Sequence, residues 1–486
     1  MSFVAPQKYV DKSDLRADFA AAISAMYKAE VPLYADLIEI VQDINQSLLS
    51  CSSLASNLER LTAERHGAIR LGTAHELHTI QRIFKLLDMH PVGYYDLSVA
   101  GLPMHATAFR PTSVASLEKN PFRVFTTLLR PELLASARAR ALAKALLARR
   151  NIFSDALVRM LDTADSQDGQ LTDAQAKVFV GEALRTFSWQ PVAASTDREY
   201  EILKAEHPIL ADIACFKTAH INHLTPRTLD ISRAQRTMVE RGMRAKERIE
   251  GPPPRACPIL LRQTSFLALE EQVSFYTDAD AGSLVPSTHT ARFGEIEQRG
   301  AALTPTGRDL YDALLAESAA QSSAGLGPAA ADAAAKQVFA AFPDTWESLR
   351  GQDLIYCRYA VVKRLERKPA FTGAHKTLLD QLVADGCVEA VPITYEDFLP
   401  FSAAGIFRSN LSSASSSEED LNVQKGGPDQ AGLESALGCP FLDIYEWYDG
   451  VQRASLEAVG QEFGVDVATL TIQLQKASRV SLSSIY

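Results

Sequence analysis

The sequence predicts an α+β fold built on an internally duplicated, curved β-sheet. Two stretches of the chain each follow a βαβββ-like order, in which a short strand pattern precedes an amphipathic helix and further strands. A helical stretch rich in Ala, Leu and Arg, at about residues 131–210, separates the two. Duplicated modules of this kind can close around a metal ion, with ligands drawn from the inner face of each module.

The N-terminal segment, residues 1–64, is expected to be helical. Apolar residues recur in it at intervals of three or four, namely Leu33, Leu37, Ile40, Val41, Ile44 and Leu48. The first module follows directly. Its patterns predict a strand at 66–73, a helix at 74–89, and strands at 104–110 and 122–129.

The second module repeats this order after the helical insertion. A strand is expected within 215–231 and a helix at 232–248. Three strand patterns then follow at 259–269, 271–276 and 288–297. Together the two modules define a predicted metal-binding core at residues 65–304.

Four further segments complete the predicted domain organisation. They are a helical, winged-helix-like segment at 305–395, a core-completing segment at 396–408, an insertion at 409–436 and C-terminal helices at 437–486. The insertion is rich in Ser, Glu, Gly and Gln, a composition that predicts disorder because it offers few apolar side chains for burial.

Composition is that of an ordinary soluble globular protein. Of the 486 residues, 47% are hydrophobic and 22% are charged. The formal net charge of −10 argues against nucleic-acid binding as the main function. The six cysteines form no C-x-x-C pair and are expected to be reduced, and no apolar run is long enough for a membrane span. We therefore expect a cytoplasmic enzyme, whose oligomeric state the sequence does not define.

One expected strand carries two acidic side chains on a single face. Because side chains alternate along a strand, Glu295 and Glu297 share a face with Phe293 and Arg299. Carboxylates on the inner face of a sheet are costly to bury without a cation. Arg299 can neutralise its neighbour Glu297, which favours Glu295 as a metal ligand, although alternation does not separate the two.

Two histidine segments can supply the remaining ligands. His66 stands at the start of the first module, and His220 and His223 stand near the start of the second. Alternation directs His220 and His223 to opposite faces, and His223 is favoured because it lies deeper in the strand-like run 221–229. Two imidazoles and one carboxylate on three strands form the facial triad typical of non-haem Fe(II) oxygenases.

Other charged residues allow further interpretations. Arg70 lies four residues after His66, so on a strand it points the same way and can clamp a substrate carboxylate, although both residues also suit an exposed strand end. His75 and His78 share a face of the expected helix, and His289 is a reserve ligand near the Glu295 strand.

Two other function classes fit the sequence less well than a metal site does. Residues 303–310 (LTPTGRDL) look like the wing-to-helix segment of winged-helix regulators, which would make the protein a DNA-binding regulator. The acidic balance and the lack of a basic recognition helix argue against it. A Ser-His-Asp hydrolase is disfavoured because the chain has no G-x-S-x-G motif.

Four motifs in order resemble a known family. Residues 293–299 (FGEIEQR) look like the strand that carries the carboxylate ligand in 4-hydroxyphenylpyruvate dioxygenases, which are vicinal oxygen chelate proteins. Together with residues 65–70 (RHGAIR), 220–227 (HINHLTPR) and 397–407 (DFLPFSAAGIF), they are more closely similar to the 2-oxoadipate dioxygenase/decarboxylase family, over nearly the whole chain.

The resemblance implies a vicinal-oxygen-chelate-like fold with an Fe(II) site formed by His66, His223 and Glu295. It implies oxidation of 2-oxoadipate by O2 to 2-hydroxyglutarate with loss of CO2, a step of lysine catabolism. The partners would then be a small 2-oxo diacid and O2, without nucleic acid or membrane. Another 2-oxo-acid or ring-cleaving dioxygenase on the same scaffold is the alternative enzyme, and a non-catalytic ligand- or DNA-binding regulator is the alternative outside enzymes.

The resemblance also implies a substrate-binding group. Arg70, with the region of Phe401 and Ser402, would receive the substrate's carboxylate. The insertion at 409–436 follows that region closely, so the sequence leaves the shape of the pocket rim open.

Overall fold

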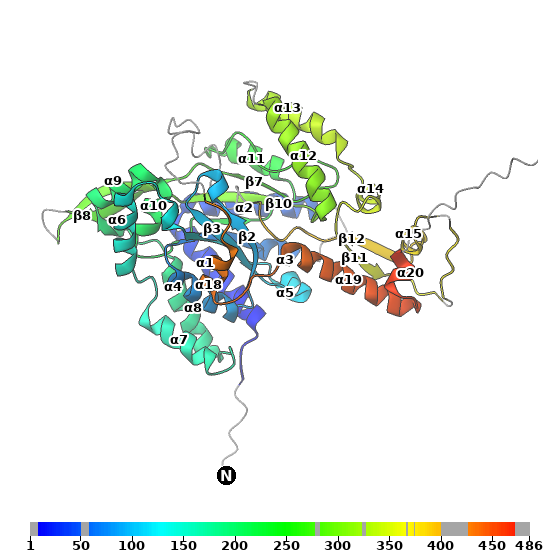
Figure 1. Cartoon of the computed structure of the whole chain (residues 1–486), viewed down its shortest axis with the longest axis horizontal. Helices are drawn as coiled ribbons and strands as arrows, with labels where there is room; N and C mark the ends of the chain where they lie inside the picture. The colour runs from blue at the N-terminus through cyan, green and yellow to red at the C-terminus, as the bar shows by residue number, and fades with distance from the viewer. Residues whose placement is uncertain are drawn as a thin grey trace, which may run out of the picture. The chain divides into compact units, whose positions relative to one another are not determined.

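The computed structural model describes residues 8–49, 58–277, 282–322, 327–365, 368–373, 375–399 and 426–471. The chain divides into two compact units, and many of their elements are labelled in Figure 1. Unit 1 comprises Met1–Pro252, Leu261–Arg299 and Asp397–Asp443, and unit 2 comprises Pro253–Leu260, Gly300–Glu396 and Ile444–Tyr486. None of the helices in the described ranges combines the length and the apolar character that a bilayer crossing requires.

Unit 1 is organised around a seven-stranded sheet with the order β2-β3-β4-β1-β6-β10-β7. Its strands are β1 (Arg65–Leu71), β2 (His90–Asp96), β3 (Met104–Arg110), β4 (Arg123–Leu129), β6 (His223–Pro226), β7 (Leu261–Ser265) and β10 (Phe293–Arg299). Strand β1 pairs parallel with β4 and antiparallel with β6, while β10 pairs parallel with β6 and antiparallel with β7.

The sheet contains the same arrangement twice. In the first half, β1 is followed by α4 (Ala74–Leu86) and then by β2, β3 and β4. In the second half, β6 is followed by α11 (Ile231–Glu240), β7 and β10, and the parallel pair β6/β10 corresponds to β1/β4. The segment 245–250 forms only isolated bridges to the outer side of β7, where the first half has a further full strand. The predicted α+β fold with a duplicated sheet is confirmed.

The expected strand at 288–297 is two strands in different sheets. Strand β9 (Leu284–Thr290) pairs with β8 (Glu270–Tyr276), which also pairs with β5 (Val192–Thr196), and these three form a separate sheet. Buried Arg292 stands at the junction between β9 and β10 and forms ion pairs with Glu271 and Glu30. The sequence pattern had assigned the strand at 271–276 to the second module, and that prediction is wrong, because β8 belongs to the separate sheet.

Strand β2 was not predicted from the sequence. A bulge shifts its register against β3 between Val92 and Tyr95. Gly93 has a φ of 73°, a left-handed conformation that a glycine adopts without steric cost. The bulge interrupts the strict alternation of apolar and polar residues, and this alternation is the pattern by which a strand is recognised in a sequence.

Helices cover the sheet of unit 1 and fill the insertion between its halves. They are α1 (Lys12–Glu30), α2 (Pro32–Leu49), α3 (Leu58–Ala63), α5 (Val114–Lys119), α6 (Ala137–Arg149), α7 (Asp155–Asp165), α8 (Asp173–Phe187), α9 (Asp197–Glu206), α10 (Pro208–Ala214) and α18 (Gln430–Leu437), with short 3₁₀ turns η2 (Ser98–Ala100) and η3 (Pro131–Leu133). Pro32 begins α2 because proline is tolerated in the first turn of a helix but not in its interior. Thr172 and Thr196 start α8 and α9 with capping boxes.

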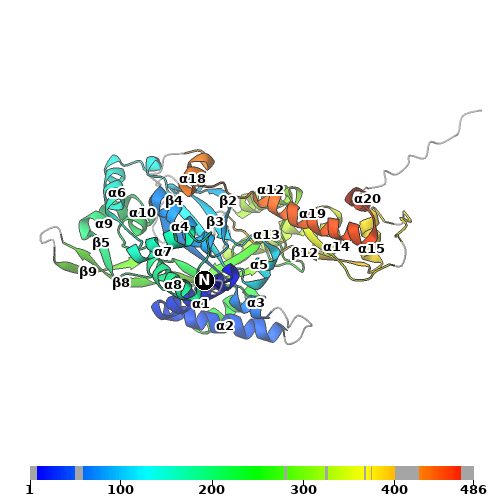
Figure 2. The same cartoon turned by 90° about the horizontal axis from the view of Figure 1, so that it is seen from below.

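The two faces of the seven-stranded sheet have different chemistry. One face is apolar and packs on α1, α2, α4 and α8, of which α1 and α2 lie along the lower edge of unit 1 in Figure 2. Its residues include Ile69, Leu71, Val124, Leu128, Leu224 and Ile296. The alternate residues of the same strands form the inner face, which carries buried polar and charged side chains, among them His66, Thr127, His223, Thr225, Gln263 and Glu295. The candidate site residues thus lie on the inner face of the sheet, opposite the face that packs against the helices of the apolar core.

Unit 2 is a smaller assembly of helices around a two-stranded sheet. Its elements are α12 (Pro305–Ser322), α13 (Pro328–Val338), η4 (Phe339–Ala341), α14 (Trp346–Gly351), β11 (Cys357–Val361), α15 (Leu378–Ala384), β12 (Val388–Pro392), α19 (Ile444–Phe463) and α20 (Val467–Thr471). Strands β11 and β12 pair antiparallel, and β11 packs against α19.

The segment predicted to be a disordered insertion is helical at its C-terminal end. Residues 409–425 lie outside the described residues, but Gln430–Leu437 forms α18. The Asp429 side chain accepts a hydrogen bond from the Gly432 N–H at 3.0 Å and caps the helix. Leu433 and Leu437 are completely buried in the core of unit 1, and this burial stabilises a helix that the local composition disfavours.

Candidate metal centre

Three side chains from separate strands converge on the inner face of the sheet. His66 of β1, His223 of β6 and Glu295 of β10 are buried, and their ligand atoms all lie within 4.8 Å of one another. Nε2 of His66 lies 3.1 Å from Oε1 of Glu295, and Nε2 of His223 lies 3.9 Å from the same oxygen. The three therefore surround a volume of the size that one metal ion occupies.

Strand register explains this convergence. His223 lies opposite Ala68 on one neighbouring strand and opposite Phe293 on the other. His66 and Glu295 are each two residues from those partners, so alternation keeps both on the face of His223. Three ligands more than 70 residues apart in the chain thus follow from two strand pairings and a period of two.

Several potential ligand atoms of the site have no hydrogen-bond partner among the described residues. Oε1 of Glu295 accepts hydrogen bonds from Thr225 Oγ1 at 3.1 Å and from Gln263 Nε2 at 2.7 Å. Within the described ranges, Oε2 of Glu295 and all four ring nitrogens of His66 and His223 lack a hydrogen-bond partner of acceptable geometry. Buried polar atoms are normally paired, so this group of unpaired atoms fits residues that hold a metal ion.

Glu297 lies behind the centre and is paired with other groups. Its Oε1 lies 2.8 Å from Nε of Arg299, and its Oε2 lies 2.9 Å from Nδ1 of His66. Burial raises the pKa of Glu297, but the charges of Arg299 and His66 lower it by a larger amount. The resulting pKa lies well below the usual range of a glutamate. The negative charge of an ionised Glu297 favours a proton on the nearby Nδ1 of His66, which leaves the lone pair of Nε2 directed towards the centre, a common arrangement around metal-bound histidines.

The two imidazoles differ electrostatically. Burial lowers the pKa of His66, yet the neighbouring Glu297 charge raises it to above the usual value. Burial lowers the pKa of His223 to about 4, although the Glu295 charge opposes this. His223 is therefore neutral at pH 7, the form in which an imidazole binds a metal.

Aromatic rings border the centre on one side. The Phe398 ring lies 5.1 Å from His66 and 5.4 Å from Phe125, which in turn lies 5.1 Å from Tyr95. Phe398 belongs to the motif at 397–407, and its neighbour Asp397 is held by a buried ion pair in which Nε of Arg110 lies 2.7 Å from Oδ1 of Asp397. The predicted substrate-binding residues Phe401 and Ser402 lie outside the described residues.

A second buried cluster surrounds Arg70. Its Nη1 lies 2.5 Å from Oδ2 of Asp212 on α10, and Oδ1 of Asp212 lies 3.2 Å from His220 and 2.9 Å from His289. The structure thus separates the two histidines of the 220–227 motif. His223 lies with His66 and Glu295, whereas His220 lies with Asp212 and with His289, the residue considered from sequence as a reserve ligand.

Helix α4 contributes no side chain to either cluster. Nδ1 of His78 lies 3.1 Å from the carbonyl oxygen of Leu437, and the His75 ring packs 6.2 Å from Phe153. Both side chains lie on the exposed face of α4, so their spacing does not mark a metal site.

Sequence reasoning missed Thr225, Gln263 and Asp212. Asp212 had a detectable signal, because it is the one charged residue of the apolar helix α10 (PILADIA), where a buried carboxylate requires a partner. Thr225 and Gln263 had no such signal, since their contribution depends on which strand pairs with β10.

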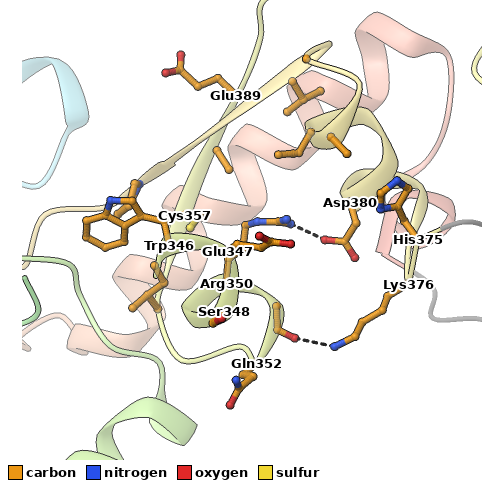
Figure 3. A pocket seen from close by; sticks show the side chains of 18 of the residues that line it. Trp346, Glu347, Ser348, Arg350, Gln352, Cys357, His375, Lys376, Asp380 and Glu389 are labelled. Carbon is orange, nitrogen blue, oxygen red and sulfur yellow. Dashed lines mark hydrogen bonds and ion pairs between the residues drawn. The ribbon is translucent and has the colours of Figure 1, made fainter. Parts of the chain in front are cut away.

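Unit 2 contains a pocket of different character. Its volume is about 1290 Å³, and Trp346, Cys357, His375, Lys376 and Glu389 are among its lining residues. Figure 3 shows its ion pair between Arg350 and Asp380, whose Nη1 and Oδ1 lie 2.5 Å apart. Both groups with metal-ligand geometry among the described residues lie in unit 1, so this pocket is not a candidate metal centre.

Comparisons with known proteins match the chain to one family. A family model described as 2-oxoadipate dioxygenase/decarboxylase matches residues 19–410. A protein of that name from Escherichia coli (strain K12) is 45% identical over 464 residues, which cover 93% of this chain and 99% of the relative. A protein of the same name from Pseudomonas putida is 45% identical over 466 residues, covering 93% and 97%.

A solved structure extends this similarity to the fold. The hydroxyglutarate synthase from Pseudomonas putida, in complex with 2-oxoadipate, matches with a TM-score of 0.82 and 42% sequence identity. The match covers 94% of this chain and 99% of that chain. Because the family model spans most of the sequence and the relatives align over nearly their full length, this chain belongs to the 2-oxoadipate dioxygenase/decarboxylase family.

Proposed function

We propose that this protein is an Fe(II)-dependent dioxygenase that converts 2-oxoadipate and O2 into 2-hydroxyglutarate and CO2, as a cytoplasmic step of lysine catabolism. The observation that carries the proposal is the buried group of His66, His223 and Glu295, whose ligand atoms lie within 4.8 Å of one another. The names of the relatives support the substrate and the reaction.

The residues of the centre fit the proposed metal. Two imidazoles and one carboxylate on one side of an ion are the donor set of non-haem Fe(II) oxygenases, and they leave further coordination positions open. A bound Fe(II) ion supplies the one-electron and O2 chemistry that amino-acid side chains lack. Thr225 and Gln263 hold Glu295 in place, and Glu297 orients His66.

Arg70 is the proposed receptor for the distal carboxylate of the substrate, together with the region of Phe401 and Ser402. Arg70 shares a face of β1 with His66, four residues away, so their Cα atoms are roughly 13 Å apart along the strand. A guanidinium binds a carboxylate through paired, charge-assisted hydrogen bonds. Holding the distal end of the diacid at a set distance from the centre directs its 2-oxo acid end towards the metal ligands.

The atoms of the reaction balance without another co-substrate. The carboxyl group beside the 2-oxo carbon leaves as CO2. One oxygen atom of O2 enters the new carboxylate and the other enters the new hydroxyl group. The Phe398 ring packs against His66, and Phe125 and Tyr95 extend this row of aromatic rings, which would reduce access of water to the centre.

The proposal is tested by turnover of the Fe(II)-loaded protein. The protein is loaded with Fe(II) under anaerobic conditions and then mixed with 2-oxoadipate and O2. Oxygen uptake, CO2 release and the mass of the product are measured. One CO2 and one 2-hydroxyglutarate per O2 are expected.

A panel of other 2-oxo acids and ring substrates separates the alternatives. Turnover of a different substrate with none of 2-oxoadipate would contradict the proposed substrate. Tight binding of 2-oxoadipate or DNA without any oxygen uptake would instead indicate a regulatory protein.

A further inference from the structure

Four side chains surround the buried carboxylate of Asp212. Arg70 Nη1 and Asn222 Nδ2 lie 2.5 Å and 3.3 Å from its Oδ2. His289 Nε2 and His220 Nε2 lie 2.9 Å and 3.2 Å from its Oδ1. Asp212 is 5% exposed, so both of its oxygens are engaged by protein groups out of contact with bulk water.

The partners of Asp212 are themselves held in place. The Tyr200 hydroxyl lies 3.0 Å from Nδ1 of His289. The Trp189 ring stacks on His289 with centroids 6.0 Å apart and meets His220 edge-on at 4.8 Å. These contacts restrict both imidazoles to one orientation, so the position of the Asp212 carboxylate is set from α9, β9 and the segment before β6.

The spacing of Asp212, His220 and His289 also satisfies the distance requirement for a metal site. One observation argues against that use. Oδ2 of Asp212 is already paired with the Arg70 guanidinium at 2.5 Å, which neutralises the carboxylate. A divalent ion here would lie beside that fixed positive charge, and like charges in a buried site are strongly unfavourable.

We propose that Asp212 is a positioning residue that fixes the Arg70 guanidinium and thereby sets the length of the 2-oxo diacid that the enzyme accepts. This inference rests on the proposed function, in which Arg70 receives the distal carboxylate. An arginine without a partner can adopt several rotamers and follow carboxylates at different distances. Tied to Asp212, it presents its donors at one distance from His66 and Glu295.

Charge and position predict opposite effects for removal of Asp212. If only charge mattered, loss of the negative carboxylate would leave Arg70 more positive and strengthen the binding of any diacid. If the position of Arg70 matters, kcat/KM falls more for the correct substrate than for a shorter diacid. A pocket that detects one methylene group discriminates by about 10–200-fold, and this is the advantage expected for 2-oxoadipate over 2-oxoglutarate.

The test compares the two diacids in three variants. Asp212→Asn keeps the size of the side chain and removes its charge, and Asp212→Glu keeps the charge and moves it by one methylene group. Asp380→Asn is the matched control, because Asp380 of unit 2 forms an ion pair with Arg350 at the same 2.5 Å and belongs to neither cluster. Fe(II)-loaded protein is assayed by oxygen uptake, and iron content is measured in parallel.

The ratio of kcat/KM for 2-oxoadipate to kcat/KM for 2-oxoglutarate is the deciding quantity. In Asp212→Asn this ratio is expected to fall by about tenfold or more, with one iron per chain retained. In Asp212→Glu the ratio is expected to shift in favour of the shorter diacid, 2-oxoglutarate. The glutamate side chain is one methylene group longer than aspartate and therefore moves the Arg70 guanidinium towards the metal ligands. In Asp380→Asn the ratio is expected to match the parent protein.

Two results would overturn the inference. An unchanged ratio in Asp212→Asn, which includes an equal fall in kcat/KM for both diacids, would reduce Asp212 to a structural role. Two metal ions per chain, with one lost in Asp212→Asn, would make the cluster a second metal site. If Asp212→Asn does not fold, His289→Gln removes one support of the carboxylate, and the ratio is expected to fall in the same direction.

The same assay separates this inference from the proposed function. Absence of oxygen uptake with 2-oxoadipate in the parent protein would refute the proposed function and this inference with it. Normal uptake in the parent protein with unaltered selectivity in the variants would refute only the positioning role of Asp212.

Discussion

His66 and His223 meet edge to face across two antiparallel strands, with ring centroids 5.3 Å apart and ring planes at 86°. Their Nε2 atoms lie 3.1 Å and 3.9 Å from one oxygen of Glu295. The sheet therefore holds two imidazoles and one carboxylate in a near-ligating arrangement by its own register. A centre organised in this way loses little conformational entropy when an ion binds.

The two histidines of the 220–227 motif are expected to differ in metal binding. His223→Ala removes a ligand atom and should leave the protein with less than a tenth of the parent's iron after loading and desalting. His220→Ala removes a partner of Asp212 and should retain the iron. Metal content by elemental analysis decides between them. Iron retained in His223→Ala and lost in His220→Ala would reverse the proposed assignment.

Arg70 is expected to recognise the distal carboxylate. Arg70→Ala should lower kcat/KM for 2-oxoadipate by about 10- to 150-fold, because a charge-assisted hydrogen bond contributes about 1.5–3 kcal/mol. Activity on 2-oxohexanoate, which lacks the distal carboxylate, serves as the internal control and should change much less. Equal losses on both substrates would show that Arg70 maintains the site without contacting that carboxylate.

Gly294 is expected to be required for packing behind the metal centre. A Cβ atom there would lie 2.3 Å from Cε1 of Phe266 and 2.9 Å from Cδ2 of Leu37, both in the apolar core. Gly294→Ala should therefore destabilise the protein by about 1–3 kcal/mol, the cost of overpacking. Urea denaturation measures this change.

Gly181→Ala provides the matched control. A Cβ at Gly181, inside α8, meets no atom within 4 Å other than the nearby backbone of its own helix. Alanine favours a helix by up to about 1 kcal/mol relative to glycine, so this variant should be unchanged or more stable. A Gly294→Ala protein as stable as the parent would mean that Phe266 can move aside.

His207 is expected to make stability depend on pH. Its neutral Nδ1 accepts the Ile209 N–H at 3.1 Å and caps α10. Burial, and then the charge of Arg70, lower its pKa from 6.5 to about 4. Between these two values the unfolded chain binds a proton that the folded protein does not. The contribution is therefore complete above pH 6.5 and is lost as the pH falls towards 4, amounting to about 3 kcal/mol.

His207→Asn isolates this contribution, because asparagine also caps helices but does not titrate in this range. Free energies of unfolding of both proteins are measured by urea denaturation from pH 7.5 to 4. The parent protein should lose more stability than the variant across that range. Parallel curves for the two proteins would show that His207 is not the titrating group.

Local periodicity was enough to predict the parts of the site that lie on regular strands. Alternation separated His220 from His223, and the structure places them in different clusters. Alternation also put Glu295 and Glu297 on one face, and Arg299 pairs with Glu297 as the sequence indicated. The assignment of His66, His223 and Glu295 as ligands stays a prediction until metal binding is measured.

Periodicity failed where the backbone departs from regular alternation. The bulge at Gly93 concealed β2, and the turn at Arg292 divided one apparent strand between two sheets. Helix α18 was missed because its stability comes from burial of Leu433 and Leu437, which the local composition does not reveal.

The sequence by itself determined the residue types, the strand faces and the duplicated order of elements, because these depend on neighbours a few residues apart. Only the tertiary structure decided which faces meet. Arg70 and Asp212 are 142 residues apart, and their contact depends on how α10 packs beside β1. That packing reflects the fit of a whole apolar core, in which each position depends on many others, and no short pattern in the chain encodes it.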